Sequence, residues 1–151
     1  MLSKKDIWIL GIVACLFFFL SPLTNLNAAD TTTPLITHID EILKANPMET
    51  GKKSQMINIA QDDTISLNVV RATEGFVLKQ HLHKTHDESI YVIKGTGQML
   101  INDKLVHIKP GSLYFNSTGK VHSIKHTGNE ELVIISIFTP ALKEADRHFV
   151  E

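Results

Sequence analysis

Short runs rich in Val, Ile, Phe and Tyr fill the chain from residue 65 to residue 138, with turn residues between them. This pattern is typical of β-strands and predicts eight of them. We expect strands near 65–71, 76–83, 89–94, 97–102, 104–109, 112–116, 121–126 and 131–138. Asn102-Asp103 predicts a two-residue hairpin turn between the fourth and the fifth strand. Regularly spaced short strands without a long helix indicate a β-sandwich or barrel.

The segments around this β-rich region have other patterns. Thr37-x-x-Asp40 predicts the cap of a short helix, and Asn46-Pro47 ends that helix. The predicted domain organisation is a targeting segment over 1–29, a lead-in with one short helix over 30–56, the all-β domain over 57–140 and a short helical or irregular tail over 141–151.

The N-terminal segment has the composition of an export signal. Lys4 and Lys5 precede an uncharged run from Ile7 to Leu20, and the small residues Ala28-Ala29 follow. Residues 1–29 therefore predict a signal peptide that is cleaved after Ala28 or Ala29, and a periplasmic or secreted mature protein.

Two alternatives to a cleaved signal remain open. Extended to Leu23, the apolar stretch 7–23 reaches the lower length limit of a spanning helix and could remain as a membrane anchor. Ile12-Val13-Ala14-Cys15 resembles a bacterial lipoprotein cleavage box. We rank the cleaved signal first, the anchor second and the lipoprotein third.

Composition excludes several classes of protein. The 151 residues include 15 Lys and Arg against 16 Asp and Glu, so the chain lacks the basic surface that nucleic-acid binding requires. The one cysteine excludes a disulfide framework and a Cys-rich zinc site. Because Cys15 lies in the predicted signal, the mature protein would contain no thiol.

The eight histidines are the main chemical clue. His81 and His83 are two residues apart on a predicted strand, so their side chains leave the same face. Glu88 begins the next predicted strand, where a hairpin return would bring it alongside, and His122 begins a later one. Three imidazoles and one carboxylate are a suitable ligand set for a first-row transition metal ion, with coordination positions left open for substrate.

The spacing of these residues resembles that of a known family. Gly75-x5-His81-x-His83-x4-Glu88-x6-Gly95 resembles the first motif of the cupin superfamily, and Gly111-x5-Ser117-x-Gly119-x2-His122-x3-His126 resembles the second. The resemblance is to small single-domain cupins and implies a double-stranded β-helix, or jelly-roll barrel, of about eight strands. It also implies that the metal ligands are His81, His83, Glu88 and His122.

The second motif departs from the family pattern at two positions. Ser117 replaces the usual proline, and His126 replaces the usual asparagine. His126 shares a strand face with His122 and is therefore our candidate catalytic residue, as an acid/base group, a donor to a ligand or a substrate contact. The alternative is a surface histidine near the end of a strand.

The remaining histidines favour structural or surface interpretations. His86, between His83 and Glu88, is expected in a solvated loop, although it could replace Glu88 as a ligand or gate the mouth of the barrel. His107 is expected to point outward, and His38 and His148 to lie on the surface outside the barrel.

Other positions predict the lining of the barrel. By parity Tyr91 lies opposite Glu88, while the orientation of Tyr114 stays open. Lys79 shares the parity of His81 and could bind an acidic substrate if it faces inward. The expected lining residues are Val69, Val77, Ile90, Val92, Met99, Ile101, Phe115, Ile124, Ile135 and Ile137.

These observations predict an exported mononuclear metal-binding cupin. It would act on a small bidentate organic substrate as a dioxygenase, isomerase or lyase, and the alternative is a non-catalytic module that binds a metal or small ligand. The cofactor would be one divalent ion of Fe, Mn, Ni, Cu or Zn. Expected partners are a small molecule and a second copy in a homodimer, with membrane contact only through an uncleaved signal.

Overall fold

The computed structural model describes residues 35–101 and 103–150. The predicted signal, its cleavage position and the two alternatives to it lie outside the described residues. Within the described ranges, no helix combines the length and the apolar character needed to cross a membrane.

The described part of the chain forms one short helix and ten strands. They are α1 (Ile39–Ala45), β1 (Ser54–Gln61), β2 (Ser66–Ala72), β3 (Val77–Leu82), β4 (Asp87–Lys94), β5 (Gly97–Ile101), β6 (Lys104–Ile108), β7 (Leu113–Asn116), β8 (His122–His126), β9 (Leu132–Thr139) and β10 (His148–Phe149).

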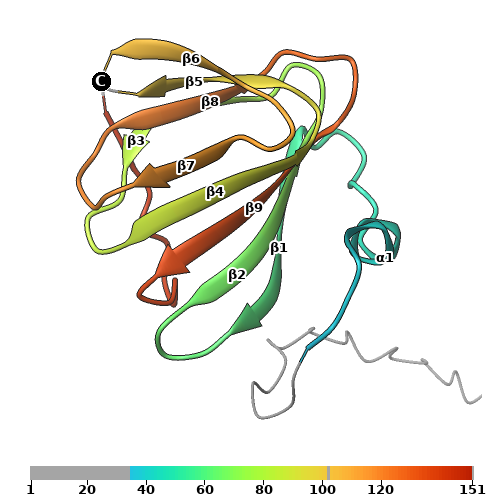
Figure 1. Cartoon of the computed structure of the whole chain (residues 1–151), viewed down its shortest axis with the longest axis horizontal. Helices are drawn as coiled ribbons and strands as arrows, with labels where there is room; N and C mark the ends of the chain where they lie inside the picture. Colours follow the sequence, from blue (N-terminus) through green and yellow to red (C-terminus); the bar gives the residue numbers. More distant parts are fainter. Residues whose placement is uncertain (1–34, 102, 151) are drawn as a thin grey trace, which may run out of the picture.

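The strands form two five-stranded sheets that face each other as two layers (Figure 1). One sheet has the order β1-β2-β9-β4-β7 and the other the order β10-β3-β8-β5-β6. All pairings are antiparallel. The predicted all-β, double-stranded β-helix fold is therefore confirmed.

The eight predicted strands correspond to β2 through β9, and the structure adds one at each end. β1 begins at Ser54 and pairs along β2, where a bulge between Asn58 and Ala60 interrupts the register. β10 pairs with β3 and forms an edge of the other sheet. The C-terminal tail is irregular until this short strand and is not helical.

The start of α1 differs from the prediction. His38 occupies the N-cap position and the helix has no side-chain cap, so the cap predicted at Thr37 was wrong. The carbonyl groups at the C-terminal end of α1 do have a side-chain partner. Arg71 donates hydrogen bonds to the carbonyl oxygens of Leu43 and Asn46 at 3.2 and 2.7 Å. Arg71 lies in β2, so these bonds tie the helix to the first sheet.

The predicted hairpin turn is confirmed by the register of its strands. Ile101 of β5 pairs with Lys104 of β6, which leaves two residues in the connection. Asp103 has a φ of 61°, as hairpin turns with two residues require.

A β-bulge in β3 changes which side chains face the interior. Leu78 pairs with Ile124, but the next paired residue is His81, opposite His122. The extra residue lets Leu78 and His81 both point inward although they are three positions apart. Val77 was therefore wrongly predicted to face inward, and its side chain is 54% exposed.

Four predicted lining residues are confirmed in the core, namely Ile90, Val92, Met99 and Ile124, and Ile101 packs against it. On β9 the inward positions are Ile134, Ser136 and Phe138, so Ile135 and Ile137 were wrongly predicted to face inward. On β7 Phe115 is 60% exposed, which contradicts its prediction too. Val69 is buried but does not line the cavity.

Candidate metal centre

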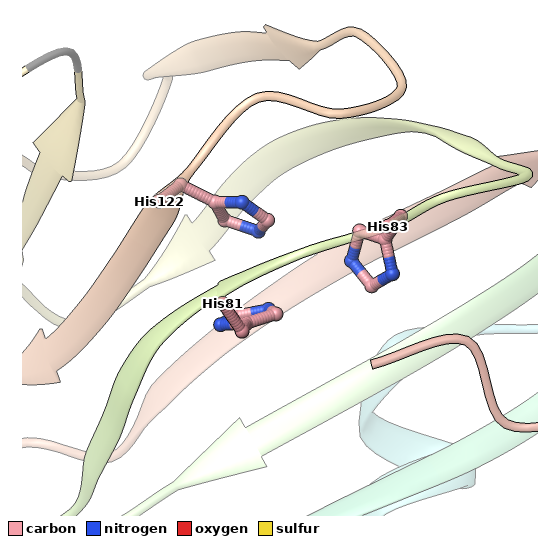
Figure 2. Close-up of side chains that lie close together, drawn as sticks. All are labelled: His81, His83 and His122. Carbon is pink, nitrogen blue, oxygen red and sulfur yellow. The ribbon is translucent and has the colours of Figure 1, made fainter. Parts of the chain in front are cut away.

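Three histidines converge between the two sheets. His81 lies near the end of β3, His83 just after it and His122 at the start of β8, where it pairs with His81. One ring nitrogen of each lies within 4.8 Å of those of the others, and the rings gather in one place (Figure 2). All three residues are buried. The structure thus brings together the histidines that the sequence predicted as ligands.

Backbone carbonyl groups orient two of these imidazoles. Nδ1 of His81 donates to the carbonyl oxygen of Lys79 at 2.9 Å. Nδ1 of His83 donates to that of Asp146 at 2.7 Å. With Nδ1 protonated, Nε2 of each neutral ring keeps its lone pair, which is the form that binds a metal.

The Nε2 atom of His83 is the ring nitrogen of the cluster that is best placed to bind a metal ion. It is buried and has no hydrogen-bond partner among the described residues. An unpartnered buried ring nitrogen is unfavourable, and a metal ion would satisfy it. The donor set therefore fits a transition metal ion, although it does not identify the element.

Glu88 projects from the inner face of β4 toward the same point. Its Oε2 lies 3.2 Å from Nε2 of His122 and 3.6 Å from Nε2 of His83. Its other oxygen accepts a hydrogen bond from the hydroxyl of Ser136 at 2.6 Å. Glu88 thus adds a buried carboxylate oxygen to the three ring nitrogens, in the place where the sequence predicted the fourth ligand.

Two hydrogen bonds in series connect Tyr114 through Asn116 to Nδ1 of His122, on the side of the ring that faces away from Glu88. The hydroxyl of Tyr114 donates to Oδ1 of Asn116 at 2.7 Å. The amide of Asn116 donates to Nδ1 of His122 at 2.9 Å. In this arrangement Nε2 carries the proton of the neutral ring and donates to Glu88. The open question about Tyr114 is answered, because its ring faces inward and its hydroxyl donates the first of these hydrogen bonds.

Burial and hydrogen bonding lower the pKa values of two groups of the cluster, His81 and Glu88. Burial lowers the pKa of His81 to about 4, and repulsion from His122 and Arg147 acts in the same direction. Burial opposes ionisation of Glu88, but the hydrogen bonds from His122 and Ser136 and the nearby ring of His83 outweigh it and lower its pKa to about 2. Glu88 is therefore a carboxylate near neutral pH.

His83 behaves differently from His81. Burial opposes its charged form, but the nearby Glu88 carboxylate and Asp146 outweigh this effect and raise its pKa above the usual range. A proton is therefore the main competitor of a metal ion at His83.

Asp146 connects the C-terminal segment to this cluster. Its carboxylate accepts hydrogen bonds from the backbone N–H groups of Lys84 and Thr85 at 3.0 and 2.8 Å. It also lies 2.7 Å from Nδ1 of His86 and 3.0 Å from Nε2 of His148. These hydrogen bonds outweigh the opposing effect of burial and hold the pKa of Asp146 well below its usual range.

This network corrects the prediction for His86. The residue is only 8% exposed, and its Nε2 lies 3.2 Å from the carbonyl oxygen of Ala141. It is a buried partner of Asp146 rather than a solvated loop residue. His148 is exposed as predicted, but it lies in β10 of the second sheet rather than outside the barrel, and its ring is hydrogen-bonded to Asp146.

A cavity of about 270 Å3 opens between the sheets next to the histidines. Its walls are largely apolar, and Glu88 and Arg147 are its charged lining residues besides the histidines. The lining comprises Ser54, Gln55, Met56, Val70, Ala72, Phe76, Leu78, His81, His83, Glu88, Ile90, Met99, His122, Ile124, Leu132, Ile134, Ser136, Phe138 and Arg147.

His126 lies at the far end of β8 from His122. It is 5% exposed, and its Nε2 donates to the carbonyl oxygen of Glu130 at 2.7 Å. It does not line the cavity described above. These contacts support a role in holding the turn after β8, and the predicted catalytic role stays a prediction.

The other predicted orientations can be compared directly. His107 and His38 are exposed, as expected. Tyr91 is 40% exposed on the face opposite Glu88, also as expected. Lys79 is exposed because it lies in the bulge of β3, so it does not share the inward orientation of His81.

Four site residues escaped the sequence reasoning. Asn116 and Ser136 are polar residues inside otherwise apolar strands, a signal that could have found them. Asp146 and Arg147 gave no local signal, because only the pairing of β10 with β3 brings them to the histidines.

The structure describes a jelly-roll fold with three buried histidines and a carboxylate at its cavity, a donor set that could hold a metal ion. The Cupin domain family model matches residues 68–138, which contain all four predicted ligands. The matched segment is just under half of the chain, and over it the chain is similar to cupins.

The chain is also similar to individual curated proteins. The chain is 28% identical over 94 residues to an L-ectoine synthase of Vibrio campbellii, covering 60% of this chain and 72% of the relative. It is 37% identical over 57 residues to an oxalate-binding protein of Thermotoga maritima, covering 38% of this chain and about half, 47%, of the relative.

A solved structure shows the same fold over most of the chain. It is an uncharacterized conserved protein with a double-stranded β-helix domain from Klebsiella pneumoniae. The TM-score is 0.65 at 21% identity, covering 79% of this chain and 99% of that protein.

Proposed function

We propose that this chain is an exported, mononuclear metal-dependent enzyme that acts on a small bidentate organic molecule, with chemistry of the dioxygenase, isomerase or lyase type. The observation that carries the proposal is the convergence of three buried imidazoles with Glu88, where Nε2 of His83 has no partner among the described residues. His81, His83, His122 and Glu88 would hold the ion.

A bound divalent ion would act as a Lewis acid that polarises a substrate oxygen. The residues of the chain prepare the site for this. Asp146 and the carbonyl of Lys79 fix the tautomers of two imidazoles. Ser136 holds one oxygen of Glu88. The apolar walls exclude water from the substrate, which strengthens electrostatic interactions within the cavity.

A second candidate function is a non-catalytic module that binds a metal or small ligand. It is favoured by the state of Glu88, the lining carboxylate, which is ionised and already hydrogen-bonded, so it is a poor general acid at neutral pH. The named relatives include both kinds of protein, a synthase and an oxalate-binding protein.

Elemental analysis of the purified protein tests the metal site. The protein would be produced with its N-terminal segment and purified without chelators or a histidine tag. About one equivalent of a transition metal supports the proposal. Protein that lacks metal, and binds none when Fe, Mn, Ni, Cu and Zn salts are offered singly, would overturn it.

Turnover separates the two candidate functions. The metal-loaded protein would be incubated with catechols, dicarbonyls and hydroxy acids, with oxygen uptake and product formation followed by mass spectrometry. Conversion that depends on the metal supports the enzyme. Tight binding of these compounds with no conversion supports the binding module.

We also propose that residues 1–29 export the protein to the periplasm or the medium, with an anchor over 7–23 as the alternative. The run from Ile7 to Leu20 carries no charge and supports either outcome. Intact-mass measurement of the protein from each cell fraction tests this. A soluble mature chain beginning near Asp30 supports cleavage, full-length chain in the membrane supports the anchor, and full-length chain in the cytoplasm contradicts both.

A homodimer is the proposed assembly. Tyr91, Leu113 and Phe115 form an exposed apolar patch on the outer faces of β4 and β7, with exposed fractions of 40, 79 and 60%. Register makes them neighbours, because Tyr91 pairs with Leu113 and Ser89 with Phe115. Light scattering of the wild type and of Phe115→Lys tests the assembly. A dimer that the substitution dissociates supports it, and a monomeric wild type at high concentration contradicts it.

A further inference from the structure

The C-terminal strand places an arginine at the edge of the cavity. In β10 Phe149 pairs with His81, and the two rings are 6.1 Å apart between centroids. Arg147 lies just before β10, on the side where this strand joins β3, and its side chain is exposed to solvent. Arg147 is also among the residues that line the cavity.

The charge of Arg147 has no carboxylate partner within the described ranges, where it forms no ion pair. The neighbouring Asp146 carboxylate is occupied by hydrogen bonds with Lys84, Thr85, His86 and His148. Glu88, the other charged lining group besides the histidines, is held by Ser136 and His122.

We propose that Arg147 binds an anionic group of the substrate, most simply a carboxylate, while another part of the same molecule faces the metal site. The inference rests on the proposed function and narrows its substrate class to small organic anions. A guanidinium group can bind both oxygens of a carboxylate through two parallel hydrogen bonds, so it fixes orientation as well as charge. The apolar walls leave few other groups that could do so.

The backbone that carries Arg147 is firmly attached. Asp146 holds it from one side through the bonds to Lys84 and Thr85. On the other side, the N–H of Val150 donates to the carbonyl oxygen of Gln80 at 3.1 Å. Because this backbone is held in place, only rotation of the Arg147 side chain can move the guanidinium. The bound anion must therefore lie within reach of that side chain, which limits its distance from the histidines.

The other candidate cation near the site does not compete for this role. Lys79 lies in the bulge of β3, is exposed and does not line the cavity. Arg147 thus supplies the positive charge that the sequence had suggested for Lys79.

Calorimetric titration of the full-length protein tests the assignment, in its metal-loaded and metal-stripped forms. The probes are oxalate, malonate and pyruvate, with oxamide and malonamide as neutral counterparts. The variants are Arg147→Gln and Arg147→Lys. The matched control is Lys143→Gln, an exposed cation of the same segment that pairs with Asp63 away from the cavity at 2.7 Å.

We expect at least one carboxylate probe to bind the wild type and Arg147→Gln to weaken it by about tenfold or more, as the loss of a charge-assisted hydrogen bond predicts. Arg147→Lys should restore part of the affinity. Lys143→Gln should resemble the wild type, and the amides should not respond to Arg147→Gln. Unchanged carboxylate affinity in Arg147→Gln, or no carboxylate binding by the wild type in either form, would overturn the assignment.

Metal content, measured on the same samples, separates this inference from the proposed function. A wild type that takes up no metal but binds a carboxylate only when Arg147 is present contradicts the metal site and supports the arginine. A metal-loaded protein whose carboxylate affinity does not depend on Arg147 supports the metal site and contradicts the role of the arginine.

Discussion

The backbone carbonyl oxygen of Asp146 lies 2.7 Å from Nδ1 of His83 and accepts a hydrogen bond from it, although the two residues are 63 positions apart in sequence. The carboxylate of the same residue binds the turn that follows His83. Asp146 therefore orients an imidazole of the site and fastens the C-terminal segment beside it. A residue outside the two sequence motifs thus contributes to the geometry of the first one.

Replacing Asp146 should weaken metal binding and stability together. Asp146→Ala removes an acceptor from the N–H groups of the exposed residues Lys84 and Thr85, whose bonds to Asp146 are partly buried, and from the buried ring of His86. Unpartnered buried donors cost about 1–3 kcal/mol each, and solvent entry relieves part of this, so we expect a loss of roughly 2–4 kcal/mol. Release of the segment should also lower metal affinity by about 10–100-fold.

Urea unfolding of the metal-free protein and a competitive chelator titration measure the two effects. Glu144→Ala is the control, because it removes an exposed carboxylate from the same segment. Asp146→Ala with wild-type metal affinity would show that the segment does not orient His83.

The histidines of the cluster should be required for metal but not for folding. We expect His81→Ala and His122→Ala each to abolish stoichiometric metal, since each removes one of three converging ring nitrogens. Mass-spectrometric metal analysis and circular dichroism measure the outcome. His107→Ala, on the exposed face of β6, should keep its metal. Retained metal in both cluster variants would sink the ligand assignment.

Much of the fold could be predicted from the sequence because its signals are local. Turn residues separated short apolar runs, and eight runs became β2 to β9. The sequence placed His81, Glu88 and His122 on or at the start of the correct strands, whereas His83 lies one residue beyond the end of its strand, and the structure brings all four together. Two-residue periodicity also placed Tyr91 on the outer face.

The rest depended on pairing between distant segments. β10 is two residues long and exists only against β3, so no local pattern could show that it brings Asp146 and Arg147 to the site. The bulge in β3 reversed the orientation of Val77 for a similar reason. β9 is apolar from Leu132 to Ile135 and again at Ile137 and Phe138, so alternation could not tell its inner face from its outer face.

The stability of the metal-free protein should decrease between pH 6.5 and pH 4 because of His81. Burial holds the pKa of His81 in the folded protein at about 4, below the usual 6.5. Between these values the imidazole is protonated in the unfolded chain and neutral in the folded protein. The contribution is fully present above pH 6.5 and is lost progressively as the pH falls to 4. At about 1.4 kcal/mol per pKa unit, its upper limit is on the order of 3 kcal/mol.

Neighbouring groups act in other windows and can be separated from His81. The lowered pKa of Glu88, about 2, contributes stability that is lost only as the pH falls from about 4.5 toward 2. The raised pKa of His83 contributes stability that is present below pH 6.5 and is lost above it. Urea midpoints at pH 7, 5.5 and 4.5 should therefore flatten in His81→Gln but keep the wild-type slope in His107→Gln. Equal slopes in both variants would show that His81 is not the titrating group.

Asn116 should matter to metal binding although it is not a predicted ligand. A metal at Nε2 of His122 requires the proton to sit on Nδ1, which now accepts a hydrogen bond from the amide of Asn116. Rotation of that amide would turn its oxygen toward Nδ1 and supply a closer acceptor than the carbonyl oxygen of Lys120, which lies 3.4 Å from Nδ1. Asn116→Leu cannot do this and should lower metal affinity about 10–100-fold, whereas Asn116→Asp should retain more of it. Chelator titration compares the two, and equal losses in both would contradict the role of the acceptor.

His126 provides the clearest contrast between a catalytic and a structural histidine. Its Nε2 donates to the carbonyl oxygen of Glu130, and the residue lies outside the cavity lining. His126→Ala should therefore lower the free energy of unfolding by about 1–3 kcal/mol, because a buried side chain and its hydrogen bond to Glu130 are lost. His126→Gln, which can still donate, should recover part of this loss, and both variants should keep the metal content of the wild type. Unfolding in urea and metal analysis of the same samples distinguish the interpretations. A variant with wild-type stability, normal metal and lost turnover of a bound substrate would show that the catalytic prediction was right.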